Sequence, residues 1–256
     1  MGSKLRILVL GASTAGLLLI SLAGCPTRPH GPQPAPGTQV EGVPAGPRSS
    51  QAVGHEGRPY DVQARESLLT ILAFRGGALA KAGHNHVIAS HDVSGTFYVP
   101  DEVLRSTFEL HVPVAELTID EPDLRGKEGA EFPTEVPESA KEGTRRNMLS
   151  EALLNGAQYP DITLLSQHIE AAATGSAVRA DVQINIRGQA HTVAVPVTYS
   201  LANGELVASG ELPIKQTDLG LTPFSAMLGA LQVQDEMRVR FRIVARRAKT
   251  RGAPGS

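Results

Sequence analysis

Apolar and polar residues alternate along much of the chain, most regularly over residues 180–199. Apolar residues occupy every second position over residues 182–186 and again over residues 193–197. A period of two residues is typical of a β-strand with one buried face. Between the two runs, Gly188-Gln189 supplies a turn in which glycine is free to adopt a positive φ. The pattern predicts a β-hairpin whose apolar face must be covered, by a second sheet or by closure of the sheet on itself.

The same alternation recurs over most of the chain after residue 66. Turn signals separate the alternating segments, and Asn203-Gly204 is the strongest hairpin signal among them. No rhythm of strand, helix and strand is visible, so an all-β, antiparallel eight-stranded barrel or a sandwich is expected, with closure favoured. Strands are predicted over residues 67–74, within 81–90, and over 94–99, 107–114, 162–169, 178–187, 192–200, 205–214 and 238–246.

Two segments replace the alternation with a helical pattern. Residues 147–155 place apolar side chains on one side of a short helix that stops at Asn155-Gly156, and residues 224–231 have a similar pattern. Both predicted helices are apolar enough to plug or gate one end of a barrel. Residues 120–146 are charged and contain Gly and Pro, which predicts an insertion on the surface rather than part of a core.

The first 25 residues have the organisation of an export signal. Lys4 and Arg6 form a basic start, residues 7–20 form an apolar segment, and Leu22-Ala23-Gly24-Cys25 follows directly. This ending resembles the lipobox of bacterial lipoproteins, which implies a signal peptide at residues 1–24 and a diacylglyceryl group on Cys25. A plain secretory signal or an uncleaved anchor is the alternative.

The remaining organisation follows from composition. Cys25 is the only cysteine, so no disulfide is expected. Pro26 follows it in place of the Asp that resembles an inner-membrane retention signal, so we expect a cell-envelope protein that is lipid-anchored to the outer membrane and faces the periplasm. Residues 25–59 are rich in Pro and Gly and are expected to form a disordered tether. A barrel domain is predicted over residues 60–248, with a disordered tail at 249–256.

Three segments resemble the YceI-like family. Residues 158–163 read QYPDIT, residues 180–197 are similar to a hairpin of the family, and residues 212–221 read LPIKQTDLGL, similar to another of its segments. The resemblance implies a lipocalin-like antiparallel barrel in the bacterial envelope, with an apolar tunnel that holds a polyisoprenoid or similar lipid tail. The chain departs from the family pattern at Leu153-Leu154, at Arg187 and at residues 83–86, which read GHNH.

The inward-facing residues of the strands and the two predicted helices are the candidate walls of a lipid cavity. A closed, dry core made of the same residues is the alternative, since eight-stranded barrels occur in both forms. The expected ligand is an isoprenoid or another long-chain lipid, and no other cofactor is expected. The candidates are Phe74, Phe97, Phe108, Leu110, Val112, Val182, Ile184, Ile186, Val193, Val195, Phe224, Met227, Leu228, Val239, Phe241 and Ile243.

His84 and His86 are the most specific polar candidates. Two positions apart in a strand, their imidazoles are expected on one face, about 6–7 Å apart at ~3.3 Å per residue. They could contact a lipid head group, or they could share a transition metal with His91, His111 or Asp92. A metal- or haem-interacting envelope protein is therefore the alternative function, and an inert scaffold is a third.

The sequence argues against catalysis and against nucleic-acid binding. It contains no nucleophile elbow and no Gly-rich phosphate loop before a helix, and its one thiol is assigned to lipid. We therefore expect a protein that is not an enzyme. The formal net charge of −2 gives no long-range attraction to nucleic acid.

Overall fold

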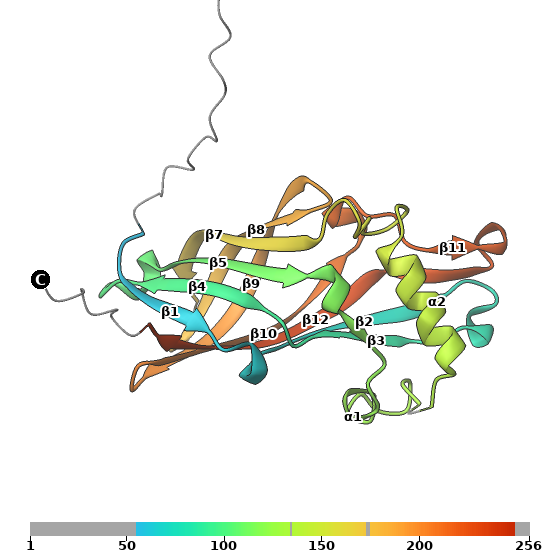
Figure 1. Ribbon diagram of the computed structural model, residues 1–256, viewed down its shortest axis with the longest axis horizontal. Helices are drawn as coiled ribbons and strands as arrows, with labels where there is room; N and C mark the ends of the chain where they lie inside the picture. The colour runs from blue at the N-terminus through green and yellow to red at the C-terminus, as the bar shows by residue number, and fades with distance from the viewer. Residues whose placement is uncertain (1–54, 134, 173–174, 249–256) are drawn as a thin grey trace, which may run out of the picture. The chain divides into compact units, whose positions relative to one another are not determined.

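The computed structural model describes residues 55–133, 135–172 and 175–248. An antiparallel sheet closes on itself because β1 pairs with both β4 and β12, which confirms the predicted barrel (Figure 1). Around the ring the order is β1, β4, β5, β7, β8, β9, β10 and β12. These strands are β1 (Arg58–Val62), β4 (Ser94–Val99), β5 (Thr107–Pro113), β7 (Asp161–Ala171), β8 (Ala177–Ile186), β9 (Gln189–Ala202), β10 (Glu205–Lys215) and β12 (Leu231–Arg247).

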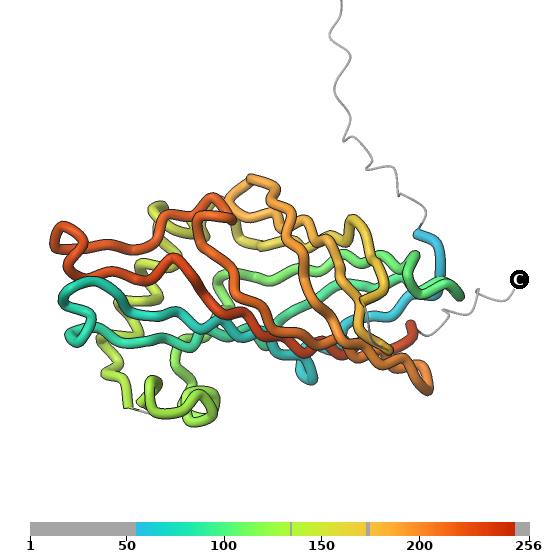
Figure 2. Tube along the Cα trace, turned by 180° about the vertical axis from the view of Figure 1, so that it is seen from behind, coloured from blue at the N-terminus to red at the C-terminus, as the bar shows by residue number. Residues whose placement is uncertain are grey.

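Further strands extend the wall toward one end of the barrel. β2 (Leu68–Gly76) follows β1 along the long strand β12, and a 3-10 turn at Ala64–Glu66 separates the two. β3 (His86–Ser90) pairs with β2, and β6 (Thr118–Ile119) pairs with β3. Figure 2 shows this extended end on its left, where the β2–β3 connection lies beside the start of β12.

α2 (Glu138–Leu149) lies beside β6 at the extended end of the barrel (Figure 1). The guanidinium of Arg145, on this helix, donates to the carbonyl oxygens of Ala115 and Leu117. A charged side chain thus satisfies backbone acceptors just before β6, and the helix closes the wall where the described strands do not.

The two hairpins predicted from the alternation are present, with turns of one type. Arg187 and Gly188 have φ of 51° and 72°, and Asn203 and Gly204 have φ of 52° and 76°. Two successive positive φ values characterise the turn that matches the twist of antiparallel strands. The first turn therefore lies one residue earlier than predicted, because Gln189 already begins β9.

The predicted helix over residues 147–155 is wrong in position. α2 begins at Glu138 and ends at Leu149, and residues 151–154 form turns. Met148 is the one buried residue of α2, so the rest of the helix has no apolar period to reveal it. The amide of Leu154 donates to the carbonyl of Met148, which folds the apolar residues after the helix back toward the barrel.

The predicted helix over residues 224–231 is wrong in kind. This segment contains β11 (Ser225–Ala226), a 3-10 turn at Met227–Gly229 and the first residue of β12. Ser225 pairs with Gln232 and Ala226 with Leu231, so the segment is a hairpin tip. In a hairpin, apolar residues at helical spacing do not share a face, and they point in different directions.

The insertion over residues 120–146 also differs from its prediction. It contains α1 (Pro122–Arg125) and α2, and its residues Leu124 and Phe132 pack on Leu72 and Val87 of the outer sheet face. β2 is apolar on both faces, so its outer face needs this cover. The insertion is therefore part of a second, smaller core.

The described part of the chain begins just before the barrel. The ring of His55 stacks on that of Tyr98 with centroids 3.9 Å apart, and β1 begins at Arg58. The sequence pattern places the start of the domain at residue 60, within β1.

Candidate functional site

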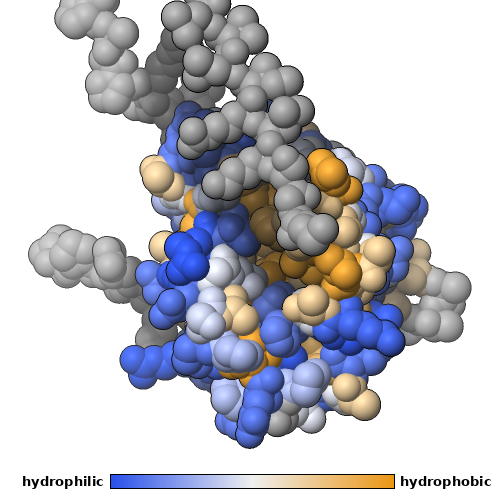
Figure 3. All heavy atoms as spheres, turned by 90° about the vertical axis from the view of Figure 1, so that its right-hand side faces the viewer, coloured by the Kyte–Doolittle hydropathy of each residue, from blue (hydrophilic) through white to orange (hydrophobic). Residues whose placement is uncertain are grey.

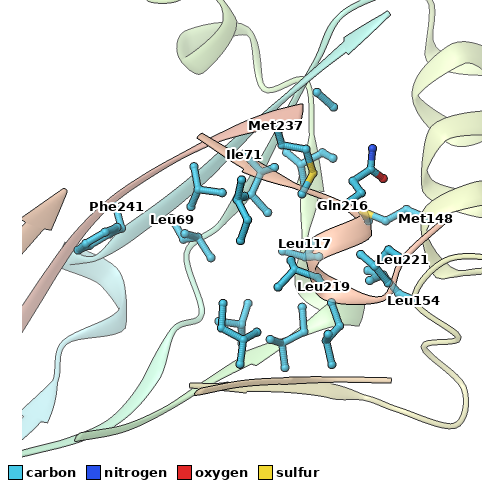
Figure 4. Close-up of a pocket in the computed structure, with 18 of the residues that line it drawn as sticks. Leu69, Ile71, Leu117, Met148, Leu154, Gln216, Leu219, Leu221, Met237 and Phe241 are labelled. Carbon is cyan, nitrogen blue, oxygen red and sulfur yellow. The ribbon is translucent and has the colours of Figure 1, made fainter. Parts of the chain in front are cut away.

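The inner face of the barrel encloses an apolar cavity of about 390 Å³. Side chains from neighbouring strands point into a common space, as Leu69 and Ile71 of β2 and Met237 and Phe241 of β12 show in Figure 4. The volume lies within the roughly 300–1,000 Å³ of typical ligand sites. The barrel is therefore hollow in its middle rather than filled by its own side chains.

One end of this cavity is closed by side chains. Ile243 is the last residue of β12 that lines the cavity, and Ala245, two positions further on, is fully buried. Tyr60, Val99 and Leu206 are buried in the same region and do not line the cavity. The cavity is therefore blind at the end where β1 and the end of β12 meet.

An apolar space of this size is costly when it is empty. At ~24 cal/mol per Å³, a void of this volume would cost on the order of 9 kcal/mol, similar to the whole net stability of a domain, about 5–15 kcal/mol. The walls would also offer water almost no hydrogen-bond partners. A ligand that fills the space would remove this cost, so the cavity has the properties of a binding site for an apolar molecule.

The polar residues that line the cavity gather at its other end, which we call the mouth. They lie at the ends of β2, β3, β10 and β12 nearest α2, and on α2 itself. Among the described residues that line the cavity there is no Asp or Glu. Seen from this end, hydrophobic residues lie in a recess bordered by hydrophilic ones (Figure 3). The polar lining residues are Arg75, His84, His86, Thr144, Asn147, Gln216 and Gln232.

A buried polar network supports the mouth from behind. Nδ1 of His86 lies 2.6 Å from Oδ2 of Asp120, and its Nε2 lies 3.1 Å from Oγ1 of Thr144 on α2. The amide of Val87 donates to Oδ1 of Asp120, and Arg125 donates to the same oxygen. Asp120 and Arg125 are fully buried, so they form an ion pair inside the second core. The network joins β3, the insertion and α2 around one imidazole.

Further bonds hold the cation of this pair. Arg125 donates from Nη1 to the carbonyl of Asn85 at 2.7 Å and from Nε to that of Pro133 at 2.8 Å, and it lies over the ring of Phe132. Burial by itself raises the pKa of Asp120, but the hydrogen bonds from His86, Val87 and Arg125 and the charge of His86 together lower that pKa below its ordinary value. Asp120 is therefore a buried carboxylate held in its charged form by its donors.

Most of the predicted cavity residues line the cavity, and most of these come from the strands with strict alternation. The ones that do are Phe97, Phe108, Leu110, Val112, Val182, Ile184, Ile186, Val193, Val195, Phe224, Val239, Phe241 and Ile243, together with His84 and His86.

Three predicted cavity residues lie elsewhere. Phe74 points to the outer face of β2, where its ring meets that of Phe132 at a centroid distance of 5.8 Å. The two-sided apolar pattern of β2 hides which face is the inner one. Met227 and Leu228 lie at the exposed hairpin tip because the helix that would have turned them inward does not form.

The rings of His84 and His86 have centroids 6.2 Å apart, close to the predicted spacing, but His84 lies outside β3, which begins at His86. Both ring nitrogens of His86 already face partners within the protein, so this imidazole is held in place by Asp120 and Thr144 rather than left open toward the cavity. His91 pairs with Glu121 and His111 with Glu109. Within the described ranges, no group of three His, Cys, Asp or Glu residues is arranged to hold a metal ion.

The structure adds cavity residues that the sequence patterns did not reveal. Leu69 and Ile71 belong to β2, and strict alternation along that strand could have found them once its inner face was known. Others lie outside long strands, where a period of two residues carries no information. These include Leu117, Met148, Leu154, Leu219 and Leu221, together with the polar residues Thr144 and Gln216.

The predicted acylation site, Cys25, lies outside the described residues. None of the helices in the described part of the chain is both long and apolar enough to cross a membrane.

Comparisons with known proteins agree with this architecture. Residues 60–245 match the YceI-like domain. The fold is similar to that of BcnA from Burkholderia cenocepacia, with a TM-score of 0.52, 19% identity and coverage of 72% of this chain and 99% of that one. A polyisoprenoid binding domain from Saccharophagus degradans, implicated in plant cell wall breakdown, aligns with a TM-score of 0.48 and 13% identity, over 74% of this chain and 98% of that one. No curated protein matches. Because the match spans most of the sequence, the chain belongs to the YceI-like family.

Proposed function

We propose that this protein binds an isoprenoid or another long-chain lipid in its barrel, without catalysis, to store, carry or sequester it. The single observation that carries the proposal is the distribution of polarity along the cavity: apolar from the blind end up to the mouth, and polar only there. That distribution matches a molecule with a long apolar tail and one polar end.

The depth of the cavity favours a long chain over a compact ligand. Lining residues on β12 run from Leu231 to Ile243, which is roughly 40 Å of strand at ~3.3 Å per residue. Each methylene buried contributes ~0.8 kcal/mol, so a chain with ten of them gains about 8 kcal/mol before the cost of association. Affinity of this origin requires length rather than hydrogen bonds.

The mouth favours a head group that accepts hydrogen bonds. Arg75 and His84 line it from one side, and the guanidinium of Arg75 is steadied by donation to the carbonyl of Gly83 at 2.9 Å. Asn147 adds an amide group from α2, whereas the amide of Gln216 already donates to the carbonyl of Gln234 at 2.8 Å. With no carboxylate among the described lining residues, a cationic head would lack a counter-charge, whereas a phosphate, carboxylate or carbonyl head would find donors.

We further propose that the protein acts in the bacterial envelope, anchored through acylated Cys25 to the outer membrane and facing the periplasm. The order of basic, apolar and lipobox-like segments before Cys25 supports this location. No cofactor other than the bound lipid and no nucleic-acid partner form part of the proposal.

The proposal is tested by native mass spectrometry of the purified protein, combined with organic extraction and metal analysis of the same sample. We expect one long-chain lipid per chain in the native spectrum and the same lipid in the extract. A stoichiometric metal with no lipid would support the histidine-dependent alternative. A protein that carries neither, and that takes up neither when lipid or metal is added, would leave the barrel as a scaffold.

A further inference from the structure

Exposed apolar side chains gather around the mouth. Leu79 comes from the β2–β3 connection, and Phe224, Met227 and Leu228 come from the β11–β12 hairpin. Met227 is 68% exposed and Leu228 109% exposed, so both side chains extend largely into solvent. Scattered exposed apolar residues are ordinary on protein surfaces, but a group around the opening of an apolar cavity is a feature of interaction sites.

We call residues 77–84 and 224–231 together the rim. The two segments are joined, because the amide of Leu79 donates to the carbonyl of Ala230 at 2.7 Å. Figures 1 and 2 show them side by side at the same end of the barrel. Phe224 belongs to the rim and also lines the cavity, so the apolar wall continues from the interior onto the outer surface.

The backbone of the hairpin tip holds its apolar residues outward. Met227, Leu228 and Gly229 have φ of 52°, 56° and 87° in succession. Residues other than glycine rarely adopt this left-handed region, and two large apolar residues in it side by side are unusual. A Gly or Asn at these positions would suit the turn better. The sequence instead places Met and Leu where nothing in the described structure covers them.

The charges of the rim point to the kind of partner. Residues 219–234 contain no charged residue, and residues 77–84 contain only Lys81. Arg75, at the base of the rim, adds a second positive charge. An apolar surface with basic residues beside it and no carboxylate within it can enter the interfacial region of a zwitterionic or anionic bilayer without burying a negative charge.

We propose that the rim is a membrane-docking surface that sets the mouth of the cavity directly against a lipid bilayer. Met227 and Leu228 enter the boundary between head groups and acyl chains, and Leu79 and Phe224 lie behind them. A long apolar chain can then pass between bilayer and cavity without being exposed to water, which is the costly step for such a ligand. The inference rests on the proposed function only for the cargo, because docking is measured independently of what the cavity holds.

The absence of Trp from the chain allows a specific test in the full-length protein. Leu228→Trp introduces a single reporter at the rim. Leu201→Trp introduces one at an exposed apolar position at the blind end, where Leu201 pairs with Leu206. Each variant is mixed with vesicles of phosphatidylcholine and phosphatidylglycerol, with and without brominated phosphatidylcholine. We expect the emission of Leu228→Trp to shift to the blue and to be quenched by the brominated lipid, while the emission of Leu201→Trp stays unchanged.

Equal responses at the two ends, or no response at the rim, would overturn the proposal. A blue shift of Leu228→Trp that needs only higher protein concentration, without vesicles, would also overturn it, because the rim would then bind a second copy of the chain. Docking with no lipid in the extract of the wild type would uphold this inference while removing the proposed function.

A pair of double variants gives a second measurement. Met227→Asn with Leu228→Asn should slow the loading of vesicle lipid into the emptied protein about ten-fold and leave the final occupancy unchanged, since the rim affects the path and not the bound state. Leu104→Asn with Leu201→Asn alters exposed apolar residues outside the rim and should load at the wild-type rate. A rim variant that loads as fast as this control would contradict the docking role.

Discussion

His86 and Asp120 are 34 positions apart in the chain, yet Nδ1 of the imidazole lies 2.6 Å from Oδ2 of the carboxylate. The carboxylate is fully buried, and the imidazole, 13% exposed, lies at the mouth of the cavity. One hydrogen bond thus connects the second core, on the outside of the sheet, with the lining of the cavity on the inside.

Asp120→Asn should destabilise the fold by about 3–5 kcal/mol, because it leaves the buried guanidinium of Arg125 without its counter-charge. Asp101→Asn, at an exposed position paired with Arg58, should change the free energy of unfolding by less than about 0.5 kcal/mol. Urea unfolding at neutral pH measures both variants. Equal stability of the two would mean that the buried pair is not needed.

The stability of the wild type should depend on pH in the direction set by Asp120. Its folded-state pKa lies below the ordinary value of 3.8, so the unfolded state binds the proton more readily. The resulting stabilisation is fully present above that ordinary value and is lost as the pH falls through the lower, folded-state pKa. Unfolding curves between neutral pH and strong acid should therefore show less acid destabilisation in Asp120→Asn than in the wild type. Parallel curves for the two proteins would exclude Asp120 as the source.

His86→Ala should cost about 1–3 kcal/mol of stability, because it removes a donor from the buried carboxylate and the contact with Thr144. His84 lines the same mouth but has no such buried partner among the described hydrogen bonds. His84→Ala should therefore leave the stability nearly unchanged. Thermal unfolding of both variants measures the difference. If His84→Ala were the more damaging change, the supporting role assigned to His86 would be wrong.

Polar substitutions inside the barrel separate a ligand cavity from a packed core. We expect at least one of Leu110→Gln and Ile184→Gln to fold with modest loss of stability and to co-purify with much less lipid, because a cavity wall can admit water. Leu72→Gln is the matched control: Leu72 is buried in the second core and does not line the cavity, so its replacement should destabilise the fold by several kcal/mol. Unfolding of every cavity variant would contradict the binding site.

The proposed lipid anchor can be tested apart from the barrel. Cys25→Ala should release the protein from the membrane fraction or leave an unprocessed precursor, since the acyl chains cannot be attached. Fractionation of cells, with the electrophoretic mobility of each form, measures the outcome. A variant that fractionates and migrates like the wild type would contradict acylation at Cys25.

The sequence pattern identifies the inner face of a strand correctly where the other face is exposed to solvent. β8 and β9 alternate cleanly, so their inner residues, including Ile184 and Val195, could be identified without a structure. β2 could not be read in this way. Its outer face is covered by Leu124 and Phe132 from a distant segment, so the strand is apolar on both faces. For this reason the sequence pattern assigns Phe74 to the inner face, although it lies on the outer one.

The mouth of the site could not be predicted for a related reason. Its residues come from strand ends, a helix and loops that are brought together only by the fold. Thr144 lies on a helix whose solvent-facing surface gives no apolar period, and Asp120 lies in a charged segment that resembles a solvated loop. No local sequence pattern predicts that Asp120 and Thr144 will both contact the imidazole of His86.

If the cavity holds a lipid chain as proposed, its blind end limits the length of that chain. A chain held in it must enter tail first and leave by the same opening, so the layer formed by Tyr60, Leu206 and Ala245 acts as a fixed stop. A tail shorter than the distance from this stop to the mouth leaves part of the wall unfilled. A longer tail pushes methylenes into water at ~0.8 kcal/mol each. Larger side chains in this layer should therefore favour shorter tails, and smaller side chains should favour longer ones. The preferred head group should stay the same.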